Sequence, residues 1–201
     1  MKRARGLTKE LLRRVPSALR VGMTERSLSW RIEQWARELG AERMAFDTIV
    51  GFGSHTSMPH HRPTSRTLRK GHLVQIDLGI VYRGYCSDLS EVFFTARPSA
   101  MEEKVVGALK EAKKTATRAA VAGAVAADID QAARRILRSY GLEEAFCHAL
   151  GHGVGLEVHE GVTISPKSKD RLLPGEVITI EPGVYFPGKF GMRVEDMVFV
   201  E

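Results

Sequence analysis

Two stretches of the chain repeat apolar residues every three or four positions, the spacing that gives an α-helix one apolar face. The same four positions are apolar in each stretch: Leu28, Ile32, Trp35 and Leu39, and then Ile129, Ala133, Ile136 and Tyr140. Equally spaced glycines enclose both stretches, Gly22 with Gly40 and Gly123 with Gly141. Thr24 is a good N-cap residue, whereas Val125 at the matching position is not and needs help, for which Asp128 is available. The pattern therefore predicts two related helices.

A second pair of similar stretches predicts β-strands. Residues 70–80 and 174–184 each contain a turn glycine, then a β-branched apolar run, then one carboxylate, Asp77 or Glu181. A further carboxylate follows each copy, Asp88 in the first and Glu195 in the second. A carboxylate inside an apolar run is costly to bury unless a partner or a metal compensates its charge. Because the cost recurs at the same place in both copies, we expect four carboxylates on two facing hairpins, suited to divalent cations.

The remaining patterns complete an α+β prediction. Basic residues near the N-terminus begin a short amphipathic helix, and Ser99 caps a long helix from Met101 to about Ala122. The expected strands are Phe46–Gly51, Leu73–Val81, Tyr85–Thr95, Phe146–Ala149, Gly155–His159, Glu176–Glu181 and Met192–Val200. Strands interleaved with helix pairs favour helices covering one face of a mainly antiparallel sheet. We expect one domain over residues 1–201, built from pseudo-twofold halves at about 8–97 and 98–201.

Composition narrows the function classes. The 201 residues are 43% hydrophobic and 27% charged, as in an ordinary globular protein, and contain no apolar run long enough for a membrane span. The net charge of +6 comes largely from basic clusters that a solvated helix face explains, including Arg5, Lys9 and Arg134, so we expect no nucleic-acid partner. Two cysteines, Cys86 and Cys147, make no disulfide framework, which favours the cytoplasm; Cys86 is interpreted as a small buried hydrophobe.

A histidine between the two acidic copies adds an imidazole to the carboxylates. His152 lies in Gly151-His152-Gly153, where flanking glycines let the backbone approach a ligand closely. Imidazole is the commonest neutral ligand of divalent transition metals. The predicted metal ligands are Asp77, Asp88, His152, Glu181 and Glu195. This set suits two divalent ions about 3.5–4 Å apart, and its many oxygen atoms favour manganese, with cobalt or zinc as alternatives.

The order of these five motifs resembles the pita-bread metallopeptidases, which comprise the methionine aminopeptidases, prolidases and aminopeptidases P. The similarity runs from about Gly22 to the end of the chain. It implies the pita-bread fold and a dinuclear metal centre held by the five ligands. It also implies that a water shared by the ions attacks the scissile carbonyl, with Glu181 as proton shuttle. His60 and His159 match the two histidines that line the substrate site in this family, and the family pattern favours His60 over the adjacent His61.

Other segments resemble the proline-specific branch. They are Phe46–Val50, Met58–Thr64 and Leu156–Glu160, and the His-Gly pair usual in methionine aminopeptidases is absent. The expected substrate is a peptide with proline at its second position, cleaved before the proline. The alternatives are a methionine aminopeptidase and a peptide-binding module that has lost catalysis. Whether the chain is a monomer or a homodimer stays open.

Three departures from the branch bear on that expectation. Glu91 stands where the family usually has an arginine, which reverses a charge near a bridging carboxylate, and Val162 stands where a proline is usual. Prolidases and aminopeptidases P also carry an N-terminal domain that helps to form the dimer and close the site. The sequence matches their catalytic domain only, so we expect either a small free-standing enzyme or a catalytic fragment.

Overall fold

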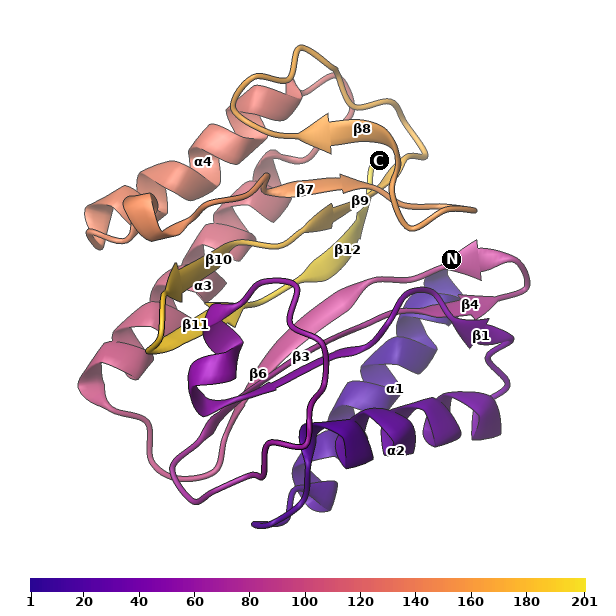
Figure 1. Ribbon diagram of the computed structural model, residues 1–201. Helices are drawn as coiled ribbons and strands as arrows, with labels where there is room; N and C mark the ends of the chain where they lie inside the picture. Colours follow the sequence, from indigo (N-terminus) through magenta and orange to yellow (C-terminus); the bar gives the residue numbers. More distant parts are fainter.

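The computed structural model describes residues 1–201. It has four α-helices, two short 3-10 helices and twelve strands (Figure 1). In chain order these are α1 Lys2–Ala18, α2 Glu25–Glu38, β1 Arg43–Met44, β2 Ile49–Phe52, η1 Gly53–Ser57, β3 Leu73–Leu78, β4 Ile80–Tyr82, β5 Tyr85–Cys86, β6 Leu89–Phe94, α3 Ala100–Ala119, α4 Ala126–Ser139, η2 Glu143–Ala145, β7 Gly151–Gly153, β8 Glu160–Ile164, β9 Val177–Ile180, β10 Gly183–Phe186, β11 Phe190–Arg193 and β12 Asp196–Phe199.

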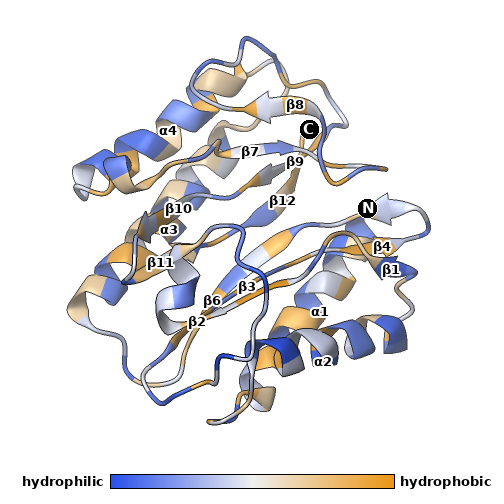
Figure 2. Cartoon of the chain, viewed as in Figure 1, coloured by the Kyte–Doolittle hydropathy of each residue, from blue (hydrophilic) through white to orange (hydrophobic).

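The α+β prediction is confirmed, because every paired strand is antiparallel and the helices lie in two pairs, α1 with α2 beside β3 and β4, and α3 with α4 beside the C-terminal strands (Figure 1). The two larger sheets have the orders β2-β3-β6 and β12-β9-β7-β8. Short pairings, β1-β4-β5 and β10-β11, accompany them. The helices turn their apolar faces toward the strands and their polar faces outward (Figure 2). None of the helices has the length and apolar character that a membrane crossing needs.

The two halves begin their second helix in the same way, as the pseudo-twofold prediction requires. Thr24 forms an isolated antiparallel bridge with Thr67, and Val125 forms the matching bridge with Arg171. Thr24 caps α2 with its side chain, while Val125 makes no side-chain cap. Asp128 supplies no side-chain cap; instead the Ala126 backbone N–H donates to the Asp170 carbonyl at 2.9 Å. The first half makes the matching contact, from the Glu25 N–H to the Arg66 carbonyl at 3.1 Å, so the backbone arrangement is repeated although the side-chain cap is not.

Each half has its own apolar core. One cluster joins α1 and α2 to β3 and β4, and includes Leu11, Leu28 and Ile76. The other joins α3 and α4 to β9 and β11, and includes Leu109, Ile129 and Ile178. The apolar stripes predicted for α2 and α4 face these cores.

Two predicted strands, Phe146–Ala149 and Gly155–His159, are wrong. The carbonyls of Phe146 and His148 accept hydrogen bonds from the Arg134 guanidinium at 3.2 and 2.9 Å, so they need no strand partner. Residues 155–159 turn on themselves, with the Gly155 N–H bonded to the Glu157 carbonyl at 3.0 Å. The strands lie beside these segments instead, as β7 and β8, so His152 is on a strand rather than in a loop.

The three longest predicted strands are each interrupted. The first breaks at Gly79, where an added Cβ would lie 1.9 Å from the Ser87 carbonyl oxygen, so only glycine fits. The second breaks at residues 87–88 and the third at 194–195. Asp88 and Glu195 occupy the second and third breaks. The irregular backbone frees their side chains from the alternation of a regular strand.

Buried and partly buried polar contacts join the two halves. The Gln75 side chain accepts the Arg193 backbone N–H at 2.8 Å and donates to its carbonyl at 3.1 Å. Arg5 and Lys9 on α1 contact Asp196 on β12, with closest distances of 2.6 and 2.8 Å. The interpretation of the basic clusters as merely solvated is therefore wrong for Arg5 and Lys9, which hold α1 against the other half. It is also wrong for Arg134, whose side chain is 13% exposed and pairs with Asp130 at 2.6 Å.

The two cysteines are free, as expected. Cys86 is buried at 1% exposure, and its thiol donates to the Leu156 carbonyl at 3.4 Å. Cys147 is exposed. The interpretation of Cys86 as a small buried hydrophobe agrees with its position in the first core.

Candidate metal centre

The five predicted ligands come from strands of both halves. Asp77 is on β3, and Asp88 lies between β5 and β6. His152 is on β7, Glu181 follows β9 directly, and Glu195 lies between β11 and β12. All five line one cavity of about 670 Å³. The structure therefore brings together residues that are separated by more than half of the chain.

Strand alternation explains why Asp77 faces the cavity. Its neighbours Ile76 and Leu78 pack into the first core against α1 and α2. Successive side chains on a strand point to opposite faces, so Asp77 and Gln75 point away from the helices. The register pairs Asp77 with Ser90 on β6 and with Ile49 on β2. The burial of the apolar residues thus fixes the direction of the carboxylate.

Three of the ligands lie close enough to share one ion. Ligand atoms of Asp88, His152 and Glu195 all lie within 4.8 Å of one another. Nε2 of His152 is 3.6 Å from Oδ2 of Asp88 and 3.5 Å from Oε1 of Glu181. Nδ1 of the His152 ring lies 3.0 Å from the Gly153 carbonyl oxygen, and the backbone N–H of His152 donates to the Thr179 hydroxyl at 3.1 Å. The group combines imidazole nitrogen with carboxylate oxygen, a donor set typical of zinc, cobalt and manganese.

Two buried oxygens favour cations at this site. Oδ1 of Asp77 and Oδ1 of Asp88 are buried and have no hydrogen-bond partner. A buried carboxylate oxygen without a donor is costly, and a cation removes that cost. Asp77 does not belong to the close group of Asp88, His152 and Glu195. Its unpaired oxygen therefore needs positive charge at a different place from the unpaired oxygen of Asp88. The residues therefore fit a divalent metal.

The pKa values of the metal-free site also favour bound cations. Burial, together with the carboxylates of Glu195, Asp77 and Glu181, raises the pKa of Asp88. Burial also raises the pKa of Glu181 to about 8 and lowers the pKa of His152 to about 4. Carboxylates with raised pKa values are repelling one another in a dry environment. Bound cations relieve that repulsion, and the neutral imidazole leaves its nitrogen free as a ligand.

Arg193 is the main residue of the site to which the sequence assigned no role. It is 3% exposed and its guanidinium contacts Asp77, the Ser90 hydroxyl at 3.0 Å and the Tyr185 hydroxyl at 2.6 Å. Its Nε also lies 3.9 Å from Oε2 of Glu181. When all four carboxylates are ionised, one guanidinium leaves a net negative charge for cations to balance. An arginine two positions before an acidic ligand in an apolar run was the available signal.

Ser90, His148 and Tyr185 form the outer part of the same network. The Ser90 hydroxyl donates to Oε2 of Glu195 at 2.8 Å. The Tyr185 hydroxyl lies 3.1 Å from Nε2 of His148, and burial lowers the pKa of His148 to about 4. No spacing rule in the sequence connects these residues to the carboxylates. Ser90, His148 and Tyr185 were missed in the sequence because they contact residues that are far away along the chain.

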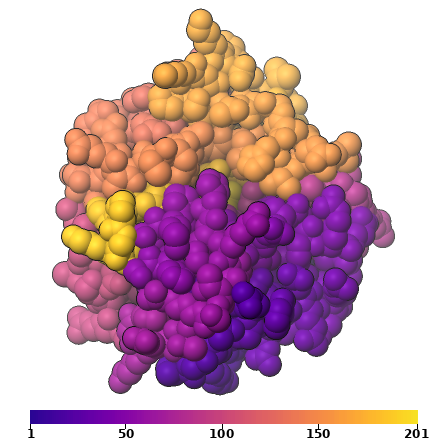
Figure 3. Space-filling view, in the orientation of Figure 1, coloured from indigo at the N-terminus to yellow at the C-terminus, as the bar shows by residue number.

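The predicted substrate histidines lie at the opening of the cavity. His60 and His159 line it and are exposed, so a bound molecule can reach both. The ring centroid of His159 is 4.0 Å from that of His152. His61 lines the same cavity but is buried, with Nε2 2.9 Å from Oε2 of Glu25. In the space-filling view, the segments that carry His60 and His159 meet in front of the C-terminal strands (Figure 3).

The departures at Glu91 and Val162 fall in different places. Glu91 does not line the cavity, and its carboxylate accepts the Val92 N–H at 3.2 Å. The negative charge that Glu91 brings in place of the usual arginine therefore lies outside the wall of the cavity. Val162 is on β8, is 7% exposed and lines the cavity.

Curated relatives share the sequence over most of this chain. An uncharacterized peptidase of Staphylococcus aureus strain MSSA476 is 41% identical over 184 residues, which cover 92% of the chain and 52% of that protein. An uncharacterized peptidase of Staphylococcus saprophyticus is 40% identical over 184 residues, covering 92% of the chain and 53% of that protein. The chain thus spans about half the length of the curated relatives it matches.

Solved structures share the fold closely. The X-Pro aminopeptidase from Thermotoga maritima matches with a TM-score of 0.96 and 37% identity, over 99% of this chain and 56% of that one. The prolidase from Thermococcus sibiricus matches with a TM-score of 0.97 and 41% identity, over 100% of this chain and 55% of that one. The model of metallopeptidase family M24 matches residues 1–201. The chain therefore belongs to metallopeptidase family M24.

Proposed function

We propose that this chain is the catalytic part of a dinuclear-metal peptidase that cleaves the bond between an N-terminal residue and proline. The observation that carries the proposal is one cavity in which four carboxylates and an imidazole meet, with buried oxygens of Asp77 and Asp88 lacking hydrogen-bond donors. Asp77, Asp88, His152, Glu181 and Glu195 would hold two divalent ions. Manganese is the preferred metal because most of the donors are oxygens, with cobalt and zinc as alternatives.

The ions supply charge stabilisation for the scissile carbonyl and activation of water when they are bound. The protein residues supply position and proton transfer. Glu181 is the proton carrier in this proposal, because its side chain is 18% exposed whereas that of Asp88 is 7% exposed. Its carboxylate therefore reaches both the buried ligands and the open part of the cavity.

His60 and His159 are assigned to the substrate. Both are exposed at the cavity, and the ring of His159 lies beside that of the ligand His152. An imidazole N–H there can donate to the carbonyl oxygen as negative charge develops on it, which lowers the barrier. The lining also contains Phe46, Val158 and Val162, which offer apolar contact to a pyrrolidine ring.

Two further points support proline specificity. Solved structures that share the fold carry the names X-Pro aminopeptidase and prolidase. The segments around Met58-Pro59-His60 and Val158-His159-Glu160 resemble the same branch in sequence. Pro59 and His60 of the first segment and all three residues of the second line the cavity, so these branch-specific residues would lie next to the substrate.

The proposal is tested by metal reconstitution with paired substrates. The protein is stripped with a chelator, and manganese, cobalt or zinc is added back before hydrolysis of Ala-Pro, Ala-Pro-Ala and Met-Ala is measured. We expect no turnover without metal and a strong preference for the proline peptides with it. Faster cleavage of Met-Ala would instead favour a methionine aminopeptidase. Bound metal without cleavage of any peptide would favour a binding module.

A further inference from the structure

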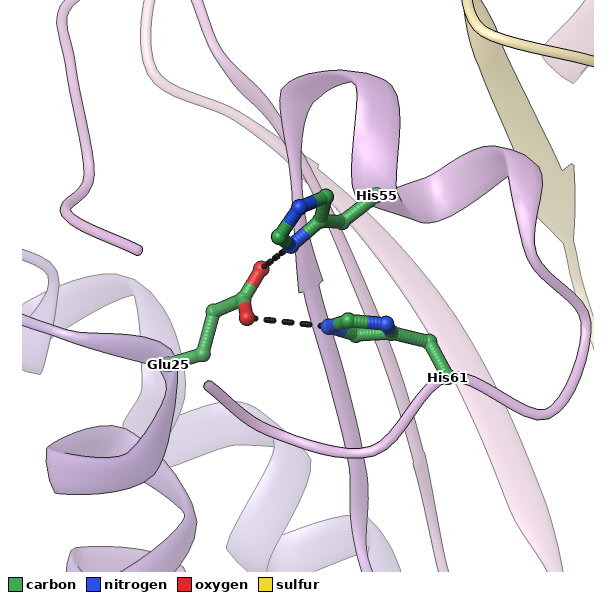
Figure 4. A group of neighbouring side chains, drawn as sticks. All are labelled: Glu25, His55 and His61. Carbon is green, nitrogen blue, oxygen red and sulfur yellow. Dashed lines mark hydrogen bonds and ion pairs between the residues drawn. The ribbon is translucent and has the colours of Figure 1, made fainter. Parts of the chain in front are cut away.

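A second group of metal-ligand side chains lies outside the five proposed ligands. Glu25, His55 and His61 come from the first turn of α2, from η1 and from the segment after η1. Each offers one ligand atom, and these atoms all lie within 4.8 Å of one another. Figure 4 shows both imidazole rings turned toward the same carboxylate.

The carboxylate at the centre of this group is fully enclosed. Glu25 is 0% exposed, yet its charge is kept: the hydrogen bonds from His61, Thr64 and Phe52 outweigh burial and lower its pKa to about 2. Phe52 and Thr64 donate backbone N–H groups at 2.9 and 3.0 Å. An ionised carboxylate fixed by backbone donors is a rigid, permanently negative ligand.

Each imidazole contacts a different oxygen of Glu25. Nδ1 of His55 is 2.9 Å from Oε1, and Nε2 of His61 is 2.9 Å from Oε2. The ring centroids of the two histidines are 4.5 Å apart. The His61 side chain is 5% exposed and that of His55 is 26% exposed, so an ion can enter past His55.

We propose that Glu25, His55 and His61 form a second, separate binding site for one divalent transition-metal ion, and that zinc is the ion its donors fit best. Two imidazole nitrogens with one carboxylate, and a fourth position left for water, form a donor set that zinc accepts. The set contains too few oxygens for calcium or magnesium. The site is distinct from the centre at Asp88, His152 and Glu195.

The geometry needs only small adjustments. Four ligands at about 2.1 Å around a tetrahedral zinc ion lie about 3.4 Å from one another. The present nitrogen–oxygen distances of 2.9 Å therefore open by a few tenths of an ångström as the ion enters between them. In a neutral imidazole the proton then moves to the other ring nitrogen, to Nε2 in His55 and Nδ1 in His61. Arg66, close to Gly53 at the start of η1, opposes a cation and limits the affinity.

The consequence concerns the segment between η1 and His61. His60 lies in this segment and faces the cavity, and His61 forms part of the cavity wall. A zinc ion would replace two hydrogen bonds by two metal–nitrogen bonds and tie the start of α2 to this wall. The site would hold the segment in place without contacting the substrate.

The test counts zinc in three forms of the full chain. Wild type, His55→Gln and His72→Gln are stripped with a chelator, equilibrated with zinc chloride, separated from free zinc and analysed by mass spectrometry. We expect wild type and His72→Gln to hold equal amounts, and His55→Gln to hold one zinc ion fewer per chain. His72 is the matched control because its ring lies near Gly53 but outside the group.

The comparison does not depend on the proposed peptidase activity, because the five proposed ligands are unchanged in all three forms. Equal zinc content in folded wild type and folded His55→Gln, checked by circular dichroism, would overturn the proposal. Zinc-edge anomalous diffraction from wild-type crystals soaked in zinc chloride provides a measurement without any variant. A peak between Glu25, His55 and His61 supports the site, and a map without that peak refutes it.

Discussion

Replacing Ser90 with alanine removes one hydroxyl that connects a proposed ligand to the buried arginine. Ser90 is 1% exposed, and its hydroxyl donates to Glu195 at 2.8 Å and accepts from Nε of Arg193 at 3.0 Å. The Ser90 carbonyl, which accepts the Glu195 backbone N–H at 3.1 Å, is retained in the variant. The change therefore acts on the orientation of the Glu195 carboxylate and leaves the strand pairing intact.

The expected loss follows from these two contacts. A hydrogen bond to a charged group contributes about 1.5–3 kcal/mol, and loss of a partner that orients a metal ligand commonly costs about 10- to 100-fold in metal affinity or activity. The two figures agree, because tenfold corresponds to about 1.4 kcal/mol. Arg193 keeps its contacts with Asp77 and Tyr185, so we expect a fall within this range rather than complete loss.

The assay is calorimetric titration of manganese into the stripped protein, together with kcat/KM for Ala-Pro at limiting manganese. Ser29→Ala is the control, since Ser29 is a buried serine on α2 that does not line the cavity. We expect Ser90→Ala to lower both quantities about 10- to 100-fold and Ser29→Ala to change neither. Unchanged manganese affinity in Ser90→Ala would show that the Ser90 hydroxyl does not position Glu195.

Three other predictions follow from the site. Asp88→Ala or Glu195→Ala should abolish dinuclear metal binding and peptide hydrolysis, and full turnover by either variant would contradict a two-metal mechanism. His159→Ala should retain metal, measured by mass spectrometry, but lose most of kcat; an unchanged kcat removes His159 from the catalytic residues. Burial lowers the pKa of His148 from 6.5 to about 4, so its protonation opposes folding as pH falls through this window. Urea titrations at about pH 6.5 and pH 4 measure how much unfolding free energy each protein loses over this range. We expect the loss in His148→Gln to be about 3 kcal/mol smaller than the loss in wild type, and equal losses would refute this.

Local sequence was sufficient for features that depend on neighbouring residues. The stripe of Leu28 and Ile32 predicted α2 because a helix has a fixed period. The strand carrying Asp77 followed from its apolar run and turn glycine. Local sequence failed at Phe146–Ala149, because Arg134 satisfies those carbonyls from a helix and no strand partner is needed.

The sequence by itself determined the duplicated pattern, the α+β class and the identity of the five ligand candidates, because a carboxylate at the end of an apolar run must be compensated wherever the chain folds. Only the tertiary structure decided which side chains surround them. Ser90 and Glu195 are 105 positions apart, and Ser90 and Arg193 are 103 apart. Such contacts depend on how two separate cores are packed against each other, and no period or spacing within either half encodes that packing.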